Sequence, residues 1–184
     1  MWALVRPGEA TKSHIDLTEV LSEICRIVRT DALLKKISLT IDVKQPIPPV
    51  FGEGVQLQQA IINLILNAFD AVSGIDDGPR EIRVEADAGE GADGVKILVH
   101  DTGKGIQLED IPRIFDPFFT TKPKRMGMGL AIAKSIVEIH GGTLSVALNS
   151  YRGTTFEIRL PSANRDLPCS TPGCDTTHRR QPVS

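Results

Sequence analysis

The stretch Ile61-Ile-Asn-Leu-Ile-Leu-Asn-Ala-Phe69 sets two asparagines, Asn63 and Asn67, in an otherwise apolar helical pattern. Residues four apart lie one above the other on a helix, so the two amides share one face. Asp70 continues that face one helical step after Asn67, and Gln59 lies on it one step before Asn63. A helix that is apolar on its other sides is a buried helix, and this one carries a polar stripe along its length.

Buried amides cost free energy unless they find hydrogen-bond partners. One interpretation of the stripe is an internal network in which the side chains bond one another and the neighbouring backbone. The other is that the stripe faces a polar ligand such as a hydrated metal ion. The helix alone leaves both interpretations open.

The composition bounds the class of protein. With 184 residues and 41% hydrophobic content, the chain can build one ordinary core, so we expect a single domain. The net charge is −2 and the charges are interleaved, so no basic face favours nucleic acid as a partner. Apolar runs stay far below the roughly 20 residues that span a bilayer, and we expect no membrane contact and a cytoplasmic location.

The periodicity of apolar residues predicts a mixture of helices and strands. Three- and four-residue spacing predicts helices over 16–34, 54–73 and 129–140, and alternation predicts strands over 37–43, 81–86, 95–99, 143–147 and 154–160. The two types do not alternate regularly. We therefore expect an α/β (α+β) fold, a two-layer sandwich in which helices cover one face of one mixed β-sheet.

The same pattern divides the chain into three parts. We assign residues 1–14 to a lead-in, a remnant of a preceding hairpin or linker, and residues 15–161 to the domain. Residues 162–184 are rich in Ser, Thr, Pro, Asn and Arg without periodicity, so we expect a disordered tail.

A glycine-rich loop, Asp101-Thr-Gly-Lys-Gly-Ile106, directly follows the strand predicted over 95–99. It offers one acceptor carboxylate beside Gly103 and Gly105, where the backbone can approach a flat ligand closely. Surface turns with Asp and Gly are common, so this segment alone does not separate a ligand site from an ordinary turn.

A second glycine segment, Gly127-Met-Gly-Leu130, opens the last predicted helix. The free N–H groups and the positive dipole at a helix start make a site for anions such as phosphate. Glycines at helix starts are also plain caps, so this segment too is ambiguous by itself.

The loop between the glycine segments is rich in phenylalanine, with Phe115, Phe118 and Phe119 within five residues. They could form a small hydrophobic cluster that pins the loop, or a movable lid that docks through its aromatic rings. The basic residues that would then lie near phosphates are Lys122, Lys124 and Arg125.

These segments, in this order, resemble the catalytic ATP-binding domain of sensor histidine kinases, within the gyrase–MutL–histidine kinase ATPase superfamily. The four boxes of that family are matched by Asn63-Leu-x-x-Asn67-Ala, Asp101-x-Gly103-x-Gly105, Phe115-x-Pro-Phe-Phe and Gly127-x-Gly129-Leu, and its closing strand by Gly153-Thr-Thr-Phe156. The resemblance covers about residues 14–161 and implies the Bergerat-type ATP-binding fold.

The resemblance also implies roles. Asn67 would coordinate the Mg²⁺ that bridges the ATP phosphates, and Asn63 would line the same catalytic site. Asp101 would accept the adenine amino group, with Thr154 in support. The remaining residues implied around the nucleotide are Asp70, Gly103, Lys104, Gly105, Ile106, Phe119, Thr120, Thr121, Lys122, Gly127, Met128, Gly129 and Leu130.

The implied activity is transfer of the ATP γ-phosphoryl group to a histidine on a dimerisation hairpin, for relay to the receiver domain of a response regulator. None of the histidines of this chain, which are His14, His100, His140 and His178, has the setting of an acceptor. We therefore expect the acceptor hairpin on a separate part of a parent kinase. A membrane anchor in that parent kinase is compatible with this expectation.

Two alternatives stay open, and a third is disfavoured. Many family members carry Lys or Arg where this chain has Asp70, so a nucleotide-binding docking module without catalysis is one alternative. An anti-sigma-type protein serine kinase is the other. A gyrase- or MutL-like ATPase is disfavoured, because those enzymes activate water with a glutamate where Asn63 stands, and an amide is no general base.

Overall fold

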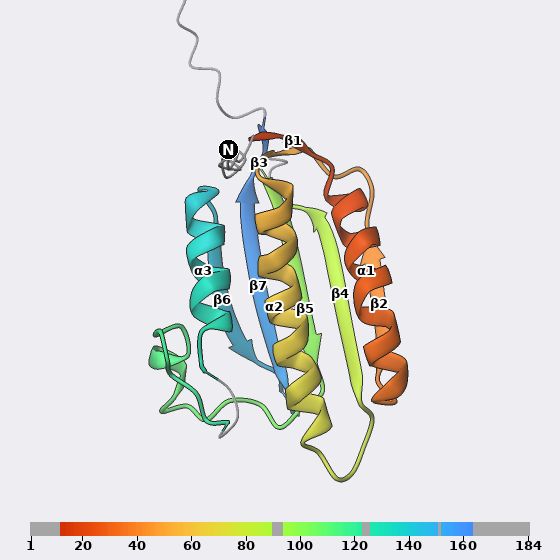
Figure 1. The fold of residues 1–184 in the computed structure, drawn as a ribbon, viewed down its shortest axis with the longest axis vertical. Coiled ribbons are helices and arrows are strands. Elements are labelled where there is room, and N and C mark those ends of the chain that lie inside the picture. Colours follow the sequence, from red (N-terminus) through yellow and green to blue (C-terminus); the bar gives the residue numbers. More distant parts are fainter. Residues whose placement is uncertain (1–11, 90–93, 123–125, 151, 164–184) are drawn as a thin grey trace, which may run out of the picture.

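A five-stranded mixed sheet forms one layer of the protein, and three helices cover one of its faces (Figure 1). The computed structural model describes residues 12–89, 94–122, 126–150 and 152–163. The strands are β2 (Ser38–Val43), β4 (Glu81–Ala88), β5 (Gly94–Asp101), β6 (Thr143–Leu148) and β7 (Thr154–Pro161). Their order in the sheet is β2-β4-β5-β7-β6, with β2 and β4 parallel and all other pairs antiparallel.

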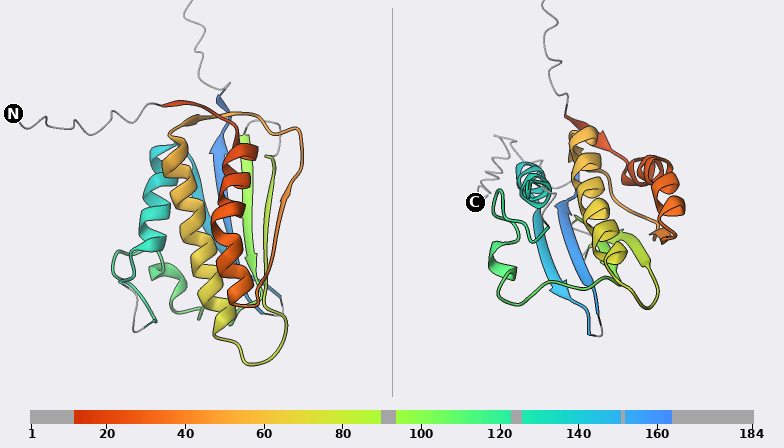
Figure 2. Two further views of the ribbon diagram at one scale, coloured as in Figure 1. Left: turned by 45° about the vertical axis from the view of Figure 1, so that its right-hand side comes forward. Right: turned by 60° about the horizontal axis from the view of Figure 1, so that its bottom comes forward.

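The helical layer consists of α1 (Leu17–Leu34), α2 (Gly54–Ser73) and α3 (Gly129–Ile139). Figure 2 shows the three helices side by side, with α2 between α1 and α3. A short 3₁₀ helix, η2 (Ile111–Arg113), lies in the connection between β5 and α3. The expectation of one mixed sheet covered by helices on one face is confirmed.

The core lies between the two layers because each element buries one apolar face. On the inner face of the sheet every second residue is buried, including Ile82, Val84, Ala86, Val95, Ile97, Val99, Phe156, Ile158 and Leu160. The central helix α2 buries Leu57, Ala60, Ile61, Leu64, Ile65, Ala68, Phe69 and Val72 against them. The observed elements agree with the expected ranges to within one or two residues, because both periodicities are clear in the sequence.

Local side chains set the ends of two helices. Asp16 caps α1, with its Oδ1 accepting a hydrogen bond of 2.8 Å from the backbone N–H of Thr18. After α3, the N–H groups of Gly141 and Gly142 bond back to the carbonyls of Glu138 and Val137, at 2.9 Å each. This is a Schellman motif, and it confirms the expected glycine cap.

The sequence prediction missed a small second sheet. β1 (Ser13–Ile15) pairs antiparallel with β3 (Val50–Gly52). Strands of three residues are too short for alternation to reveal them, and the pairing is non-local. Ser13 and His14 therefore belong to the fold rather than to the expected lead-in.

The fold also continues past the expected boundary at residue 161. The N–H of Ala163 donates to the carbonyl of Pro49 at 2.8 Å. The remainder of the expected lead-in, residues 1–11, and of the expected tail, residues 164–184, lie outside the described residues. Within the described part, no helix has the length and hydropathy that a membrane span requires.

Candidate functional site

A cavity of about 280 Å³ opens at one end of the molecule. The C-terminal half of α2, the end of β5, the start of β7 and the start of α3 meet there, at the lower end of the view in Figure 1. It is lined by Asn63, Leu66, Asn67, Asp70, Ala71, Asp101, Lys104, Gly105, Ile106, Gln107, Asp110, Ile114, Phe119, Thr120, Thr121, Lys122, Gly127, Gly129, Leu130 and Thr154. The predicted site residues thus surround one cavity, except Gly103 and Met128.

The polar stripe of α2 faces this cavity. Asn63, Asn67 and Asp70 line it, whereas Gln59 is exposed to solvent and does not. The amide Nδ2 of Asn63 is buried and has no hydrogen-bond partner among the described residues. A buried polar group without a protein partner favours a ligand over an internal network.

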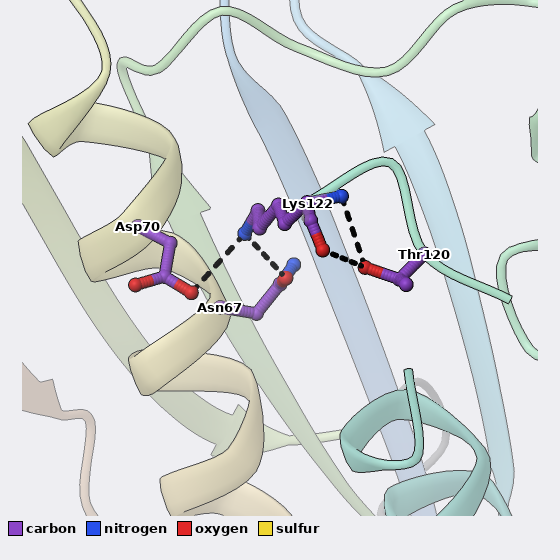
Figure 3. A network of polar contacts seen from close by, with 4 residues as sticks. All are labelled: Asn67, Asp70, Thr120 and Lys122. Atoms are coloured by element: carbon purple, nitrogen blue, oxygen red, sulfur yellow. Dashed lines mark hydrogen bonds and ion pairs between the residues drawn. The ribbon is translucent and has the colours of Figure 1, made fainter. Parts of the chain in front are cut away.

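Asn67 and Asp70 are joined through the loop opposite. The ammonium Nζ of Lys122 lies 3.2 Å from Oδ1 of Asn67 and 3.3 Å from Oδ2 of Asp70 (Figure 3). The oxygen atoms of both α2 residues therefore point at one cation. Carboxylate and amide oxygens are ligands that Mg²⁺ accepts, so the donor set fits the metal that the family resemblance implies.

Asp101 ends β5 and supplies a buried carboxylate on the opposite wall. It is only 3% exposed, and its Oδ1 accepts a hydrogen bond of 2.8 Å from the N–H of Gly103. Burial raises the pKa of Asp101, while bonds from the backbone N–H groups of Gly103 and Thr154 and the charge of Lys122 act in the lowering direction. The result is an oriented hydrogen-bond acceptor that faces the cavity.

A series of hydrogen-bonded side chains holds the backbone at Asp101, and sequence analysis did not find it. The amide Nδ2 of Asn149 donates to the backbone carbonyl of Asp101 at 3.1 Å. Thr155 donates its hydroxyl to Oδ1 of Asn149 at 2.6 Å and lies 2.7 Å from Nδ1 of His100. Burial is the main reason that the pKa of His100 is lowered, so this ring favours its neutral form.

The glycines of the loop after β5 have different tasks. Gly105 has φ +75°, a left-handed conformation, and lines the cavity as expected. Gly103 instead packs on α2, where a Cβ would fall 2.6 Å from Cβ of Ala71. The absence of a side chain at Gly103 therefore lets the loop approach the helix, and a role of its backbone toward a ligand stays a prediction.

The start of α3 presents backbone N–H groups. Met128 is the N-cap residue, and no side chain caps the helix there. Gly129 and Leu130 line the cavity, whereas Met128 does not. Free N–H groups at a helix start attract anions, so this wall suits phosphate.

The phenylalanine-rich loop is only partly docked. The ring of Phe115 packs edge-on against Phe156 at 6.4 Å, and Arg113 lies over the ring of Phe119 at 4.8 Å. Phe118 is 72% exposed with φ +66°, so two of the three rings pack and the third faces solvent. The predicted phosphate partners Lys124 and Arg125 lie outside the described residues.

Five lining residues were missed by sequence analysis, namely Leu66, Ala71, Gln107, Asp110 and Ile114. Leu66 and Ala71 follow Asn63 and Asn67 by three and four residues, so helical spacing could have found them. The other three belong to the irregular connection, where no periodicity exists to reveal which side chains face inward.

Comparisons with known proteins agree with this architecture. A family model described as histidine kinase-, DNA gyrase B- and HSP90-like ATPase matches residues 52–164. The sensor histidine kinase ZraS of Escherichia coli K12 is 36% identical over 158 residues, which cover 86% of this chain and 33% of ZraS. This chain thus spans about a third or less of the length of these curated relatives.

Solved structures share the fold. The catalytic domain of the histidine kinase ThkA has a TM-score of 0.72 and 25% identity, over 83% of this chain and 98% of the other. Full-length ShkA in complex with AMPPNP has the same score and identity, over 83% of this chain and 31% of ShkA. The chain belongs to the histidine kinase-, DNA gyrase B- and HSP90-like ATPase family, with the fold of a histidine kinase catalytic domain.

Proposed function

We propose that this chain is the ATP-binding catalytic domain of a two-component sensor histidine kinase. It transfers the γ-phosphoryl group of ATP to a histidine on the dimerisation hairpin of a parent kinase, for relay to the receiver domain of a response regulator. One observation carries the proposal. The cavity places the buried acceptor Asp101, the amides of α2 and the uncapped start of α3 around one space.

Each wall has a task in binding the nucleotide. Asp101 accepts a hydrogen bond from the adenine amino group, which selects adenine over guanine because guanine presents a carbonyl at that position. Thr154 and Gly105 bound the same end of the cavity, and the N–H groups of Gly127 and Gly129 donate to phosphate oxygens. Asn67 would hold Mg²⁺, which would supply positive charge opposite the phosphates.

The residue at position 63 favours transfer to a protein over hydrolysis. Its amide lies in the cavity, and an amide has no basic site with which to deprotonate a water molecule. We expect slow ATP hydrolysis for this reason. We expect the acceptor histidine on the hairpin, and His100, the histidine next to Asp101, is hydrogen-bonded to Thr155 of β7.

Nucleotide binding is tested by calorimetry with ATP and Mg²⁺. We expect the folded Asp101→Ala variant to lose measurable affinity, because the adenine amino group loses its acceptor. Asp42→Ala, which removes a carboxylate from β2 outside the cavity, is the matched control and should bind like the wild type. Equal affinity in the Asp101 variant and the wild type contradicts the proposed site.

The acceptor is tested with radiolabelled ATP and the dimerisation hairpin of the parent kinase. Phosphohistidine is labile in acid and stable in base, so the chemistry of the labelled product identifies the residue. Label on the hairpin histidine supports the proposal. Nucleotide binding without any transfer favours the docking module, and acid-stable label on serine favours the anti-sigma-type kinase.

A further inference from the structure

The contact between Lys122 and α2 has the chemistry of an occupied cation site. Oδ1 of Asn67 and Oδ2 of Asp70 come from residues three apart on one helix and lie 3.2 and 3.3 Å from the same ammonium nitrogen (Figure 3). A simple surface ion pair needs only the carboxylate. Here an amide oxygen and a carboxylate oxygen converge on one positive charge at the edge of the cavity.

The loop is shaped to deliver this ammonium. Oγ1 of Thr120 accepts a hydrogen bond of 3.0 Å from the N–H of Lys122, which closes a tight turn in the loop backbone. From that turn the Lys122 side chain extends back to α2, where it is only 26% exposed. The Lys122 ammonium thus links this loop to α2.

Two oxygen atoms, one of them anionic, are also a typical protein contribution to a Mg²⁺ site. Mg²⁺ is commonly held by one or two carboxylates, with water and substrate phosphates as the other ligands. No group of three or more His, Cys, Asp or Glu side chains suited to a metal occurs within the described residues. A divalent cation at α2 would therefore complete its coordination with water or with oxygen atoms of a bound ligand.

We propose that Asn67 and Asp70 together form a divalent-cation site, and that the Lys122 ammonium occupies it in the metal-free protein. Asp70 is then a metal ligand, and Lys122 is an internal competitor for the same two oxygens. An ammonium and a divalent cation repel at this distance, so Lys122 leaves α2 when the metal binds. The proposal deepens the proposed function, on which it rests for the phosphates that complete the coordination.

This arrangement gives a role to Asp70, which stands where many members of the family carry Lys or Arg. A carboxylate facing phosphates is unfavourable by itself, because like charges repel. A carboxylate that holds a metal ion, with a lysine released toward the phosphates, supplies positive charge in their place. The metal state of the site would also decide whether Lys122 bonds α2.

Mn²⁺ binding without nucleotide tests the competition, with the EPR signal of free Mn²⁺ as the readout at constant ionic strength. The variant Lys122→Met keeps the length of the side chain and removes its charge. We expect it to bind Mn²⁺ roughly tenfold more tightly than the wild type, because two oxygens lose their resident cation. Adding Asp70→Asn to that variant should remove the gain.

The matched control is Lys44→Met, which makes the same change in net charge on an exposed side chain outside the cavity. It should bind Mn²⁺ like the wild type, and Lys122→Gln should behave like Lys122→Met. Equal affinity in the Lys122 variants and the wild type overturns the proposal, as does an equal gain from Lys44→Met. The proposal is also overturned if the gain in Mn²⁺ affinity of Lys122→Met persists when Asp70→Asn is added. Because no nucleotide is present, these results are independent of the ATP-binding test.

Discussion

The carboxylate of Asp101 is subject to two opposing influences, because its burial disfavours the charge that would bind a ligand. A carboxylate that is 97% buried prefers to be neutral, and burial is the largest influence on its pKa. Backbone N–H groups of Gly103 and Thr154 oppose this by bonding to the charged form. The charge that would accept an adenine amino group is thus retained at a cost in the stability of the fold.

This balance predicts an unusual pH dependence. The pKa of Asp101 is raised in the folded state above its ordinary value of 3.8. Its contribution to stability is therefore complete at a pH below 3.8 and is lost as the pH rises through the raised pKa. Asp101→Asn lacks the titration. We therefore expect the stability of the variant, relative to the wild type, to increase between about pH 4 and pH 7 in urea unfolding experiments. A difference that is constant or falls with pH contradicts the assignment.

Gly103 is a second position where one atom matters. A Cβ there would lie 2.6 Å from Cβ and 2.7 Å from the carbonyl carbon of Ala71, in the body of α2. We expect Gly103→Ala to lower the free energy of unfolding by about 1–3 kcal/mol, as overpacking does. Gly54→Ala, where a Cβ meets nothing within 4 Å, should leave it nearly unchanged. Equal effects of the two substitutions in urea unfolding would show that the close approach to Ala71 does not determine the cost of Gly103→Ala.

Several interactions join the end of β5 to the start of β7 and to the turn that precedes it. Asn149 bonds the carbonyl of Asp101 from the turn before β7, and Thr155 on β7 orients Asn149. Gly153 lies so close to the carbonyl of Asp101 that no side chain fits there, and its φ of +90° also favours glycine. Asp101 therefore has its position set by the neighbouring strand and not by β5 alone.

Removing this support should affect binding more than folding. We expect Asn149→Ala to cost about 1–3 kcal/mol of stability, because two hydrogen bonds are lost, and to weaken nucleotide binding because the strand end that carries Asp101 is released. Ser145→Ala on β6, outside the cavity, is the control. Unfolding and calorimetric titration on the same samples separate the two effects, and unchanged nucleotide affinity would assign Asn149 a purely structural role.

The molecule as a whole depends on one hydrophobic core. A continuous cluster of buried side chains joins α1, α2 and α3 to the inner face of the sheet. The site has no separate support, since α2 contributes one face to that core and the opposite stripe to the cavity. Folding and binding should therefore be lost together.

A core substitution tests this dependence. Leu64 is fully buried on the core face of α2, and we expect Leu64→Ala to lower the free energy of unfolding by about 2–5 kcal/mol through lost burial and a cavity. Val55→Ala, on the same helix and 71% exposed, should have little effect. Thermal unfolding with and without ATP is the measurement. A biphasic transition would contradict a single cooperative core.

Much of this architecture follows from local sequence. The helices and long strands could be predicted because their apolar residues recur at spacings that local geometry imposes. The polar stripe on α2 could be recognised for the same reason, whereas the glycine segments were ambiguous until the order of all the motifs pointed to a family. The pairing of β1 with β3 could not, because each strand has three residues and the two are far apart in the chain.

The amino-acid order alone therefore determines which elements form and which residues of α2 share a face, since both depend on neighbours within a few positions. Only the tertiary structure decides that Lys122 meets Asn67 and Asp70, which lie 55 and 52 residues earlier in the chain. It also decides that Asn149 stands behind Asp101 and that Gly103 packs on Ala71. These contacts depend on how the sheet and helices pack together, and no local periodicity encodes that.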